Sequence, residues 1–172
     1  KADYVGARGH SSTYLELFVA LVEVVLLLGF AIPLWAKIVD KAPNEANTNV
    51  VRVMAQQFGW NFMYPGPDKA FGAQDLELVT TDNKFGQVPE DEKGLDDFFT
   101  LNDLRVPSGE ATVFQIGSLD VIHSFKVIAL RVCQDAIPGI SIPTWCTPLK
   151  EGRYQINCAQ LCGNGHSAMT QG

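Results

Sequence analysis

The sequence predicts an all-β domain of Greek-key type that is preceded by one membrane-spanning α-helix. Two observations support this fold class. A long apolar run lies near the N-terminus, and after residue 50 short segments rich in β-branched and aromatic residues alternate with turn residues. The formal net charge of −6 argues against nucleic acid as a partner.

The apolar run LFVALVEVVLLLGFAIPLWA extends from Leu17 to Ala36 and contains 20 residues. A helix of that length spans roughly 30 Å, which is the thickness of the hydrocarbon core of a bilayer. The following segment KAPNEANTN is polar and contains a proline, so it is typical of a linker. The expected organisation is an N-terminal segment over residues 1–13, a transmembrane helix over 14–40, a linker over 41–49 and a β-domain over 50–172.

The expected strands share a high content of β-branched and aromatic residues and are separated by turn residues. They cover residues 50–64, 76–80, 111–118, 123–130, 139–145 and 153–158. The acidic stretch over residues 81–103 contains one proline and two glycines and predicts a loop.

Acidic residues are concentrated between Asp68 and Asp120, a stretch that contains twelve Asp and Glu residues but only four Lys and Arg residues. The simpler interpretation is a solvated surface. The alternative is a docking face for a cationic protein, with fast and salt-sensitive association.

The segment CAQLCGNGHSAM, from Cys158 to Met169, places two thiols, an imidazole and a thioether at C-x3-C-x3-H-x2-M spacing. The cysteine pair alone could be a disulfide, a thiol redox pair or half of a zinc site. His166 and Met169 favour copper, because zinc rarely recruits a thioether. Two thiolates this close can bridge two copper ions, and such a site needs a second imidazole. His123 is the candidate, since His10 lies before the membrane run.

These motifs together resemble subunit II of the haem–copper cytochrome c oxidases. The C-x3-C-x3-H-x2-M segment matches that family's dinuclear copper (CuA) loop, and DVIHSF at 120–125 matches its upstream histidine motif. QDAIPG at 134–139 matches a turn of the family, FGWNFMYPG its aromatic segment, and ELF…AIP the end of its second transmembrane helix. The resemblance covers nearly the whole chain and implies a cupredoxin-like Greek-key barrel.

The resemblance also implies a ligand set for two copper ions per chain. Two thiolates would bridge the ions, each imidazole would bind one of them, and a thioether and a main-chain carbonyl would be weak axial ligands. In that order the implied ligands are Cys158 and Cys162, His123 and His166, and Met169 and the carbonyl of Gln160. Two coppers that share one charge over a rigid core change geometry little on reduction, which suits single-electron transfer.

Electron input is expected near the aromatic segment. Phe58 stands where many relatives have the first Trp of a W-x-W pair, and Trp60 matches the second; burial in the core is the alternative for both. Asp120, three residues before His123, is the best single docking charge. Gln160 stands where many relatives have a Glu that binds Mg²⁺. Hard Mg²⁺ prefers charged oxygen, so a Mg²⁺ ion at the subunit I interface is doubtful.

Two carboxylates fall within the membrane segment. Glu16 lies 17 residues before Pro33, and in the family a Glu at that distance stands at the mouth of a proton pathway into subunit I. The alternative is an interfacial carboxylate that merely ends the helix. Glu23 lies seven residues later, on nearly the same helical face. Because a charge facing lipid is costly, both are expected to face subunit I.

The chain departs from the family pattern in two further ways. Only one of the family's two transmembrane helices is visible, and the chain stops before the strand that normally follows the copper loop. We therefore expect it to be incomplete at both ends, although a single-helix form also exists in the wider family. Cys133 and Cys146 have no role in the family pattern, and a disulfide and two free thiols are equally open for them.

The expected function is electron input to a terminal haem–copper oxidase in the cell inner membrane, with the β-domain on the periplasmic side. CuA would accept electrons from a c-type cytochrome and pass them to haem in subunit I, where O₂ is reduced to water. One alternative is the CuA-bearing part of a nitrous oxide or nitric oxide reductase. Another is a copper-delivery or quinol-oxidase subunit that transfers no electron through copper. Quinol-oxidase relatives lack the copper ligands, and all of them are present here.

Overall fold

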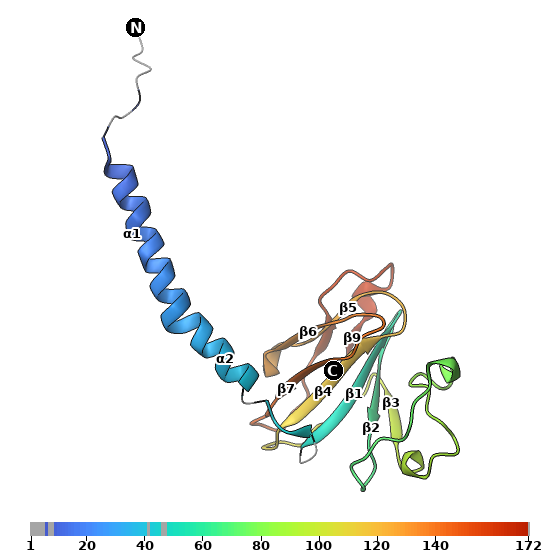
Figure 1. Cartoon of the computed structure of the whole chain (residues 1–172). Coiled ribbons are helices and arrows are strands. Elements are labelled where there is room, and N and C mark those ends of the chain that lie inside the picture. Colours follow the sequence, from blue (N-terminus) through green and yellow to red (C-terminus); the bar gives the residue numbers. More distant parts are fainter. Residues whose placement is uncertain (1–5, 7–8, 41, 46–47, 172) are drawn as a thin grey trace. The chain divides into compact units, whose positions relative to one another are not determined.

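The computed structural model describes residues 6, 9–40, 42–45 and 48–171. The chain divides into two compact units, Lys1–Ala42 and Pro43–Gly172 (Figure 1). The first unit is helical and the second is built from β-strands.

The helix of the first unit is continuous through α1 (Ser11–Leu26), the π-helical stretch η1 (Leu27–Ala31) and α2 (Ile32–Asp40). Pro33 explains the π-helical stretch, because it lacks the N–H that would bond to the carbonyl four residues earlier. None of the helix residues is buried within the chain, and the most apolar stretch of the helix has a mean hydropathy of 2.7. Within the described residues, this is the one helix long and apolar enough to cross a membrane.

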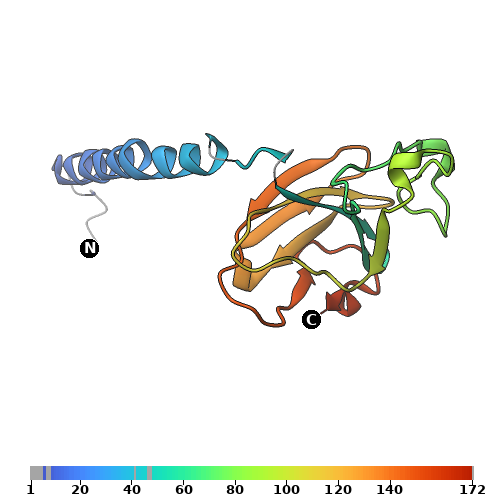
Figure 2. The ribbon, with the colours of Figure 1, turned by 90° about the horizontal axis from the view of Figure 1, so that it is seen from below.

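The second unit is a sandwich of two β-sheets (Figure 2). A five-stranded sheet has the order β3-β2-β1-β4-β7, and a four-stranded sheet has the order β6-β5-β8-β9. β1 and β4 are parallel, and every other pair of neighbouring strands in these two sheets is antiparallel. The strands are β1 (Asn49–Gln56), β2 (Gly59–Tyr64), β3 (Phe98–Leu101), β4 (Thr112–Ser118), β5 (His123–Val127), β6 (Val132–Ala136), β7 (Ile142–Cys146), β8 (Ile156–Cys158) and β9 (Thr170–Gln171).

Aromatic side chains join the two sheets. Phe125 of β5 is fully buried, and its ring lies 5.3 Å from that of Trp60, 6.3 Å from Phe62 and 5.6 Å from Phe114. The last three rings come from β2 and β4 of the other sheet. Aromatic pairs at these separations stabilise a core beyond the area that they bury. The prediction of an all-β, cupredoxin-like domain that follows an apolar helix is confirmed.

Two predictions between β2 and β4 are wrong. Residues 76–80 do not form a strand, because the Asp75 side chain accepts a hydrogen bond from the Glu77 N–H and caps a 3₁₀ turn, η3 (Leu76–Leu78). The predicted loop over residues 81–103 contains β3, which pairs with β2. Within that pair the ring of Phe98 stacks on Tyr64 at 4.7 Å, so aromatic packing outweighs the acidic composition.

Two predictions near β5 also need correction. The strand expected over 123–130 ends at Val127, and a 3₁₀ turn, η5 (Ile128–Leu130), follows it. Arg131 then takes the left-handed conformation with φ 55°, which reverses the chain into β6. β6 therefore occupies the first part of the turn expected over 134–139. Residues Thr170–Gln171 form β9 beside β8, although no strand was expected after the copper loop.

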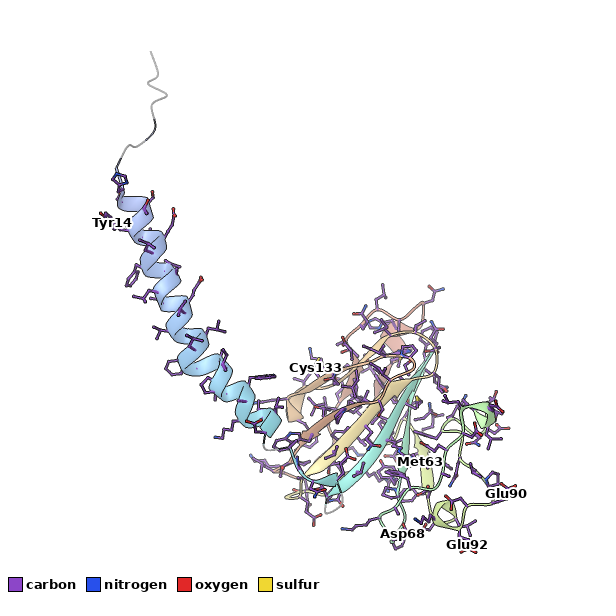
Figure 3. The ribbon with its side chains drawn as sticks, in the orientation of Figure 1. Tyr14, Met63, Asp68, Glu90, Glu92 and Cys133 are labelled. Atoms are coloured by element: carbon purple, nitrogen blue, oxygen red, sulfur yellow. The ribbon has the colours of Figure 1, made fainter. Side chains whose placement is uncertain are left out.

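Residues 65–97 leave the sandwich between β2 and β3, and we call this excursion the acidic lobe. It contains nine Asp and Glu residues and three Lys. Figure 3 shows Asp68, Glu90 and Glu92 on it. Asp91 holds the lobe together by accepting hydrogen bonds from the backbone N–H groups of Ala73 and Lys93, which lower its pKa.

Candidate metal centre

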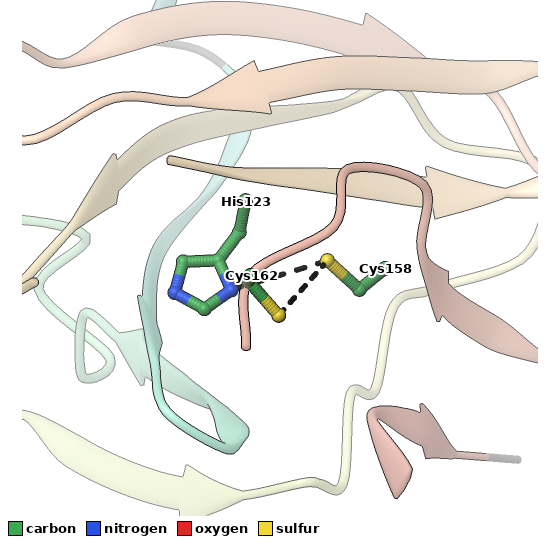
Figure 4. A group of neighbouring side chains, drawn as sticks. All are labelled: His123, Cys158 and Cys162. Atoms are coloured by element: carbon green, nitrogen blue, oxygen red, sulfur yellow. Dashed lines mark hydrogen bonds between the residues drawn. The ribbon is translucent and has the colours of Figure 1, made fainter. Parts of the chain in front are cut away.

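His123 begins β5 and is completely buried. Its Nδ1 lies 3.9 Å from Sγ of Cys158 (Figure 4). Its Nε2 lies 2.8 Å from Oδ1 of Asp120. Partial burial alone would raise the pKa of Asp120, but hydrogen bonds from His123 and from two backbone N–H groups outweigh burial and lower it. The ionised carboxylate can only accept, so Nε2 carries the imidazole proton and the Nδ1 lone pair faces the sulfur atoms.

The two cysteines of the loop lie next to this imidazole. Cys158 ends β8 and Cys162 is buried four residues later. Their sulfur atoms are 3.8 Å apart, and one ligand atom from each cysteine and from His123 lies within 4.8 Å of the others. A disulfide bond would require about 2.05 Å. Burial, with hydrogen bonding and charge from Cys158, raises the pKa of Cys162 to about 11, so the metal-free thiol is protonated at neutral pH.

The other three predicted ligands also reach this sulfur pair. Nδ1 of His166 lies 3.5 Å and Sδ of Met169 lies 3.4 Å from Sγ of Cys162. The main-chain oxygen of Gln160 lies 3.0 Å from Sγ of Cys158, while its side chain is exposed. His123 and Gln160 therefore approach one sulfur, and His166 and Met169 approach the other.

The fold explains why residues far apart in sequence meet here. β5 pairs antiparallel with β8 and places Phe125 opposite Cys158, so His123 lies beside the segment that follows Cys158. The N–H of Cys158 donates to the carbonyl of Met169, which closes the loop at 3.1 Å. Met169 is completely buried, so its thioether reaches the sulfur pair from the core side.

This donor set fits a dinuclear copper group. Two thiols, two imidazoles and a thioether are soft or borderline ligands, which favour copper over hard cations. The spacing of the sulfur atoms is compatible with bridging, and each has its own imidazole neighbour.

The aromatic residues expected at the electron-input surface take different positions. Trp60 has no exposed surface, and its ring lies 6.1 Å from that of His123, so its position agrees with the alternative of burial in the core. Phe58 is 39% exposed. Its ring packs against Gly163 and Gly165 of the cysteine loop, where an added Cβ would collide with it.

Asp120 is also less available than a docking charge should be. One oxygen bonds to His123, and the other accepts from the Gln57 N–H at 2.6 Å. Its side chain remains 31% exposed. Gln57 itself was missed in the sequence, because no spacing rule connects it to the loop 105 residues later.

The remaining candidates are two carboxylates of α1 and two further cysteines. Glu16 and Glu23 are exposed residues of α1, in the other unit. Cys133 and Cys146 are free thiols, so the disulfide alternative is wrong. Cys133 is exposed on β6 (Figure 3), whereas Cys146 is buried on β7.

The fold and the site define a cupredoxin-like domain that follows an apolar helix and gathers soft metal ligands around two free thiols. The family profile described as the periplasmic domain of cytochrome c oxidase subunit II matches residues 49–171. The chain belongs to the cytochrome c oxidase subunit II family.

Individual relatives agree with this assignment. An alternative cytochrome c oxidase subunit 2 of Bradyrhizobium diazoefficiens is 32% identical over 149 residues, which are 86% of this chain and 53% of the relative. A cytochrome c oxidase subunit 2 of Cereibacter sphaeroides is 30% identical over 98% of this chain and 59% of the relative. The chain thus spans about half the length of the curated relatives that it matches.

Two solved structures resemble the fold. The periplasmic domain of subunit II of a Bradyrhizobium japonicum cytochrome oxidase is 28% identical, with a TM-score of 0.50 over 72% of this chain and 80% of that one. A chain from a haem–copper terminal oxidase dimer has a TM-score of 0.55 over 92% of this chain and 96% of that one. At 17% identity, the second likeness concerns the fold alone.

Proposed function

We propose that this chain is the electron-input subunit of a terminal haem–copper oxidase and holds a dinuclear copper centre. The observation that carries the proposal is the pair of free thiols 3.8 Å apart, approached by two imidazoles, a thioether and a main-chain carbonyl. The ligands would be His123, Cys158, the Gln160 carbonyl, Cys162, His166 and Met169.

The bound copper pair would supply a carrier for one electron at a time. The protein buries one side of this group. His123 and Met169 are fully buried, and Trp60 and Phe125 pack edge to face behind the imidazole. Asp120 keeps the imidazole proton on Nε2, so Nδ1 remains available as a ligand. A site that cannot rearrange keeps the structural cost of electron transfer low.

The donor in this proposal is a c-type cytochrome, and the acceptor is haem in subunit I, where O₂ would be reduced to water. The exposed Phe58 ring is the favoured contact for the donor, because it touches the loop that carries Cys162 and His166. The acidic lobe would attract a basic donor.

Rapid mixing of the copper-loaded chain with a reduced c-type cytochrome tests this function. We expect fast oxidation of the cytochrome with one electron accepted per copper pair. Cys158→Ser and Cys162→Ser should abolish the reaction, and Cys133→Ser should leave it unchanged. A wild-type chain that binds copper but accepts no electron would contradict the proposal and favour a copper-binding role without electron transfer.

We also propose that residues 14–40 cross the cell inner membrane, with the linker 41–49 leading to a periplasmic copper domain over 50–172. Glu16 and Glu23 would face subunit I and take part in proton uptake. In the assembled oxidase, Glu16→Ala should slow turnover and proton uptake without altering the copper spectrum. Unchanged turnover in both Glu16→Ala and Glu16→Gln would make Glu16 a boundary residue. Gln160 is neutral and exposed, so we propose no Mg²⁺ site there.

A further inference from the structure

Gln57 occupies the turn between β1 and β2 and makes two short hydrogen bonds toward the metal centre. Its backbone N–H donates to Oδ2 of Asp120 at 2.6 Å. Its side-chain amide donates to the carbonyl of Cys162, also at 2.6 Å. The turn therefore contacts two segments that lie 63 and 105 residues away in the sequence.

Each contact leads directly to a different half of the ligand set. Asp120, which accepts the first hydrogen bond, is also hydrogen-bonded through Oδ1 to Nε2 of His123 at 2.8 Å. Cys162 accepts the second hydrogen bond with its main-chain carbonyl. Its sulfur lies within 3.5 Å of Nδ1 of His166 and of Sδ of Met169. One residue thus joins the imidazole at the start of β5 to the loop that supplies the other ligands.

The cysteine loop is shaped to receive this amide. Gly163 follows Cys162 and has a φ of +133°, a conformation that residues with a Cβ rarely adopt. A Cβ at Gly163 would lie 2.8 Å from Nε2 of Gln57. The glycine therefore leaves the space through which the amide reaches the carbonyl. Gln57 is exposed as a whole, but its bond to Cys162 is partly buried.

We propose that Gln57 is a positioning residue for the copper centre, fixing His123 and the cysteine loop relative to each other. This inference rests on the proposed function, since it assigns Gln57 to that same site. Loss of such a supporting hydrogen bond typically lowers metal affinity about 10- to 100-fold. The effect should appear in the properties of the bound metal as well as in the order of the metal-free loop.

The test compares Gln57→Met with Gln134→Met in the full chain in detergent. Both changes remove a side-chain amide and keep its length. Gln134 lies on β6, where its amide makes one 3.5 Å contact with the adjacent Asp135 carbonyl. We expect the copper of Gln57→Met to be extracted by a chelator with about 10-fold lower apparent affinity and to show an altered EPR spectrum. Gln134→Met should match the wild type.

A second measurement uses the metal-free, reduced chain. Cys162 is buried and should react slowly with iodoacetamide. Without the Gln57 bond, we expect its alkylation to accelerate about fivefold, the factor that corresponds to one net hydrogen bond. Equal alkylation rates and equal chelator resistance in Gln57→Met and wild type would overturn the inference. A wild-type chain without copper affinity would refute the proposed function, whereas the alkylation rates would still decide whether Gln57 holds the loop.

Discussion

At the residue scale, Asp120 makes internal contacts that its expected role as a docking charge did not include. Its spacing from His123 suggested a docking charge, yet both of its oxygens accept hydrogen bonds inside the molecule. Its lowered pKa means that the carboxylate stabilises the folded site above the pKa of an unfolded Asp. That contribution is lost as the pH falls through the lower pKa of the folded state.

Asp120→Asn tests this positioning role. The amide can donate as well as accept, so it no longer requires the proton to stay on Nε2 of His123. We expect copper affinity to fall about 10- to 100-fold, measured by chelator competition. Asp135→Asn, on the exposed side of β6, is the matched control and should have no effect. Equal copper affinities in the wild type, Asp120→Asn and Asp135→Asn would contradict the positioning role and leave Asp120 as a surface charge.

The two additional cysteines should differ sharply in reactivity. Burial raises the pKa of Cys146 to about 11, whereas Cys133 is exposed. Only the thiolate attacks an alkylating reagent, so at pH 8 Cys146 should react at least about 100-fold more slowly than Cys133. Mass spectrometry of the copper-loaded chain after timed alkylation checks this. A Cys133–Cys146 disulfide, or modification of both at one rate, would contradict the structure.

Most of the proposed ligands could be found in the sequence, because four candidate ligands lie within twelve residues and the thioether favours copper. The full set, with the Gln160 carbonyl, came from the resemblance to the family. The residues that support the ligands could not be predicted. Gln57 and Asp120 meet through a turn contact across 63 residues, and no local pattern encodes it. The burial of Trp60 was likewise open, since an aromatic residue in a strand suits a core and a surface equally.

At the scale of elements, the important contact joins the β1–β2 turn to the cysteine loop. Phe58 packs so closely on Gly163 and Gly165 that neither glycine can take a side chain without moving the ring. Gly165 has an ordinary backbone, with φ −92°, so only the space restricts it. The same ring remains partly exposed to solvent. The contact therefore connects the proposed electron-input surface to the metal loop.

Gly165→Ala should destabilise the chain through overpacking, by about 1–3 kcal/mol in the free energy of unfolding. Phe58→Ala should remove the obstacle, so the double variant should be less destabilised than the sum of the two single changes. Denaturant titration of the metal-free chain measures this coupling. Strict additivity would show that the ring and the glycine do not touch.

Element prediction succeeded where β-branched alternation was strong and failed where turns compete with strands. β1, β4 and β7 extend at most one residue beyond predicted segments, and β1 shows the alternating burial that the pattern predicted. The segment at residues 76–80 has the same composition, but Asp75 caps a turn there. β3 was not predicted, because it lies in an acidic stretch. It pairs with β2, and the stacking of Phe98 on Tyr64 within that pair cannot be read from the sequence.

At the scale of the whole molecule, the chain combines an apolar helix with a strongly acidic β-domain. No residue of the helix is buried within the chain, and the helix is long and apolar enough to cross a membrane. The excess negative charge is concentrated in the acidic lobe. A surface of this kind steers a basic partner and loses its effect as salt screens it.

The rate of electron transfer from a basic c-type cytochrome should therefore fall as the ionic strength rises toward 0.1 M, where the Debye length is about 10 Å. The double substitution Glu90→Gln and Glu92→Gln should lower the rate at low salt and flatten its salt dependence. The control pair Asp135→Asn and Glu151→Gln removes the same charge outside the lobe and should have a smaller effect. A wild-type rate that ignores ionic strength would indicate an apolar or tethered donor.

The most direct test of the central claim is the copper content of the purified full chain, determined together with its EPR spectrum. Two free thiols 3.8 Å apart, each with its own imidazole neighbour, lead us to expect two copper ions per chain and a hyperfine pattern from one unpaired electron shared by both nuclei. Cys158→Ser and Cys162→Ser should each remove that pattern. One copper per chain with the ordinary four-line spectrum of a single Cu²⁺ would contradict the dinuclear centre and the function built on it.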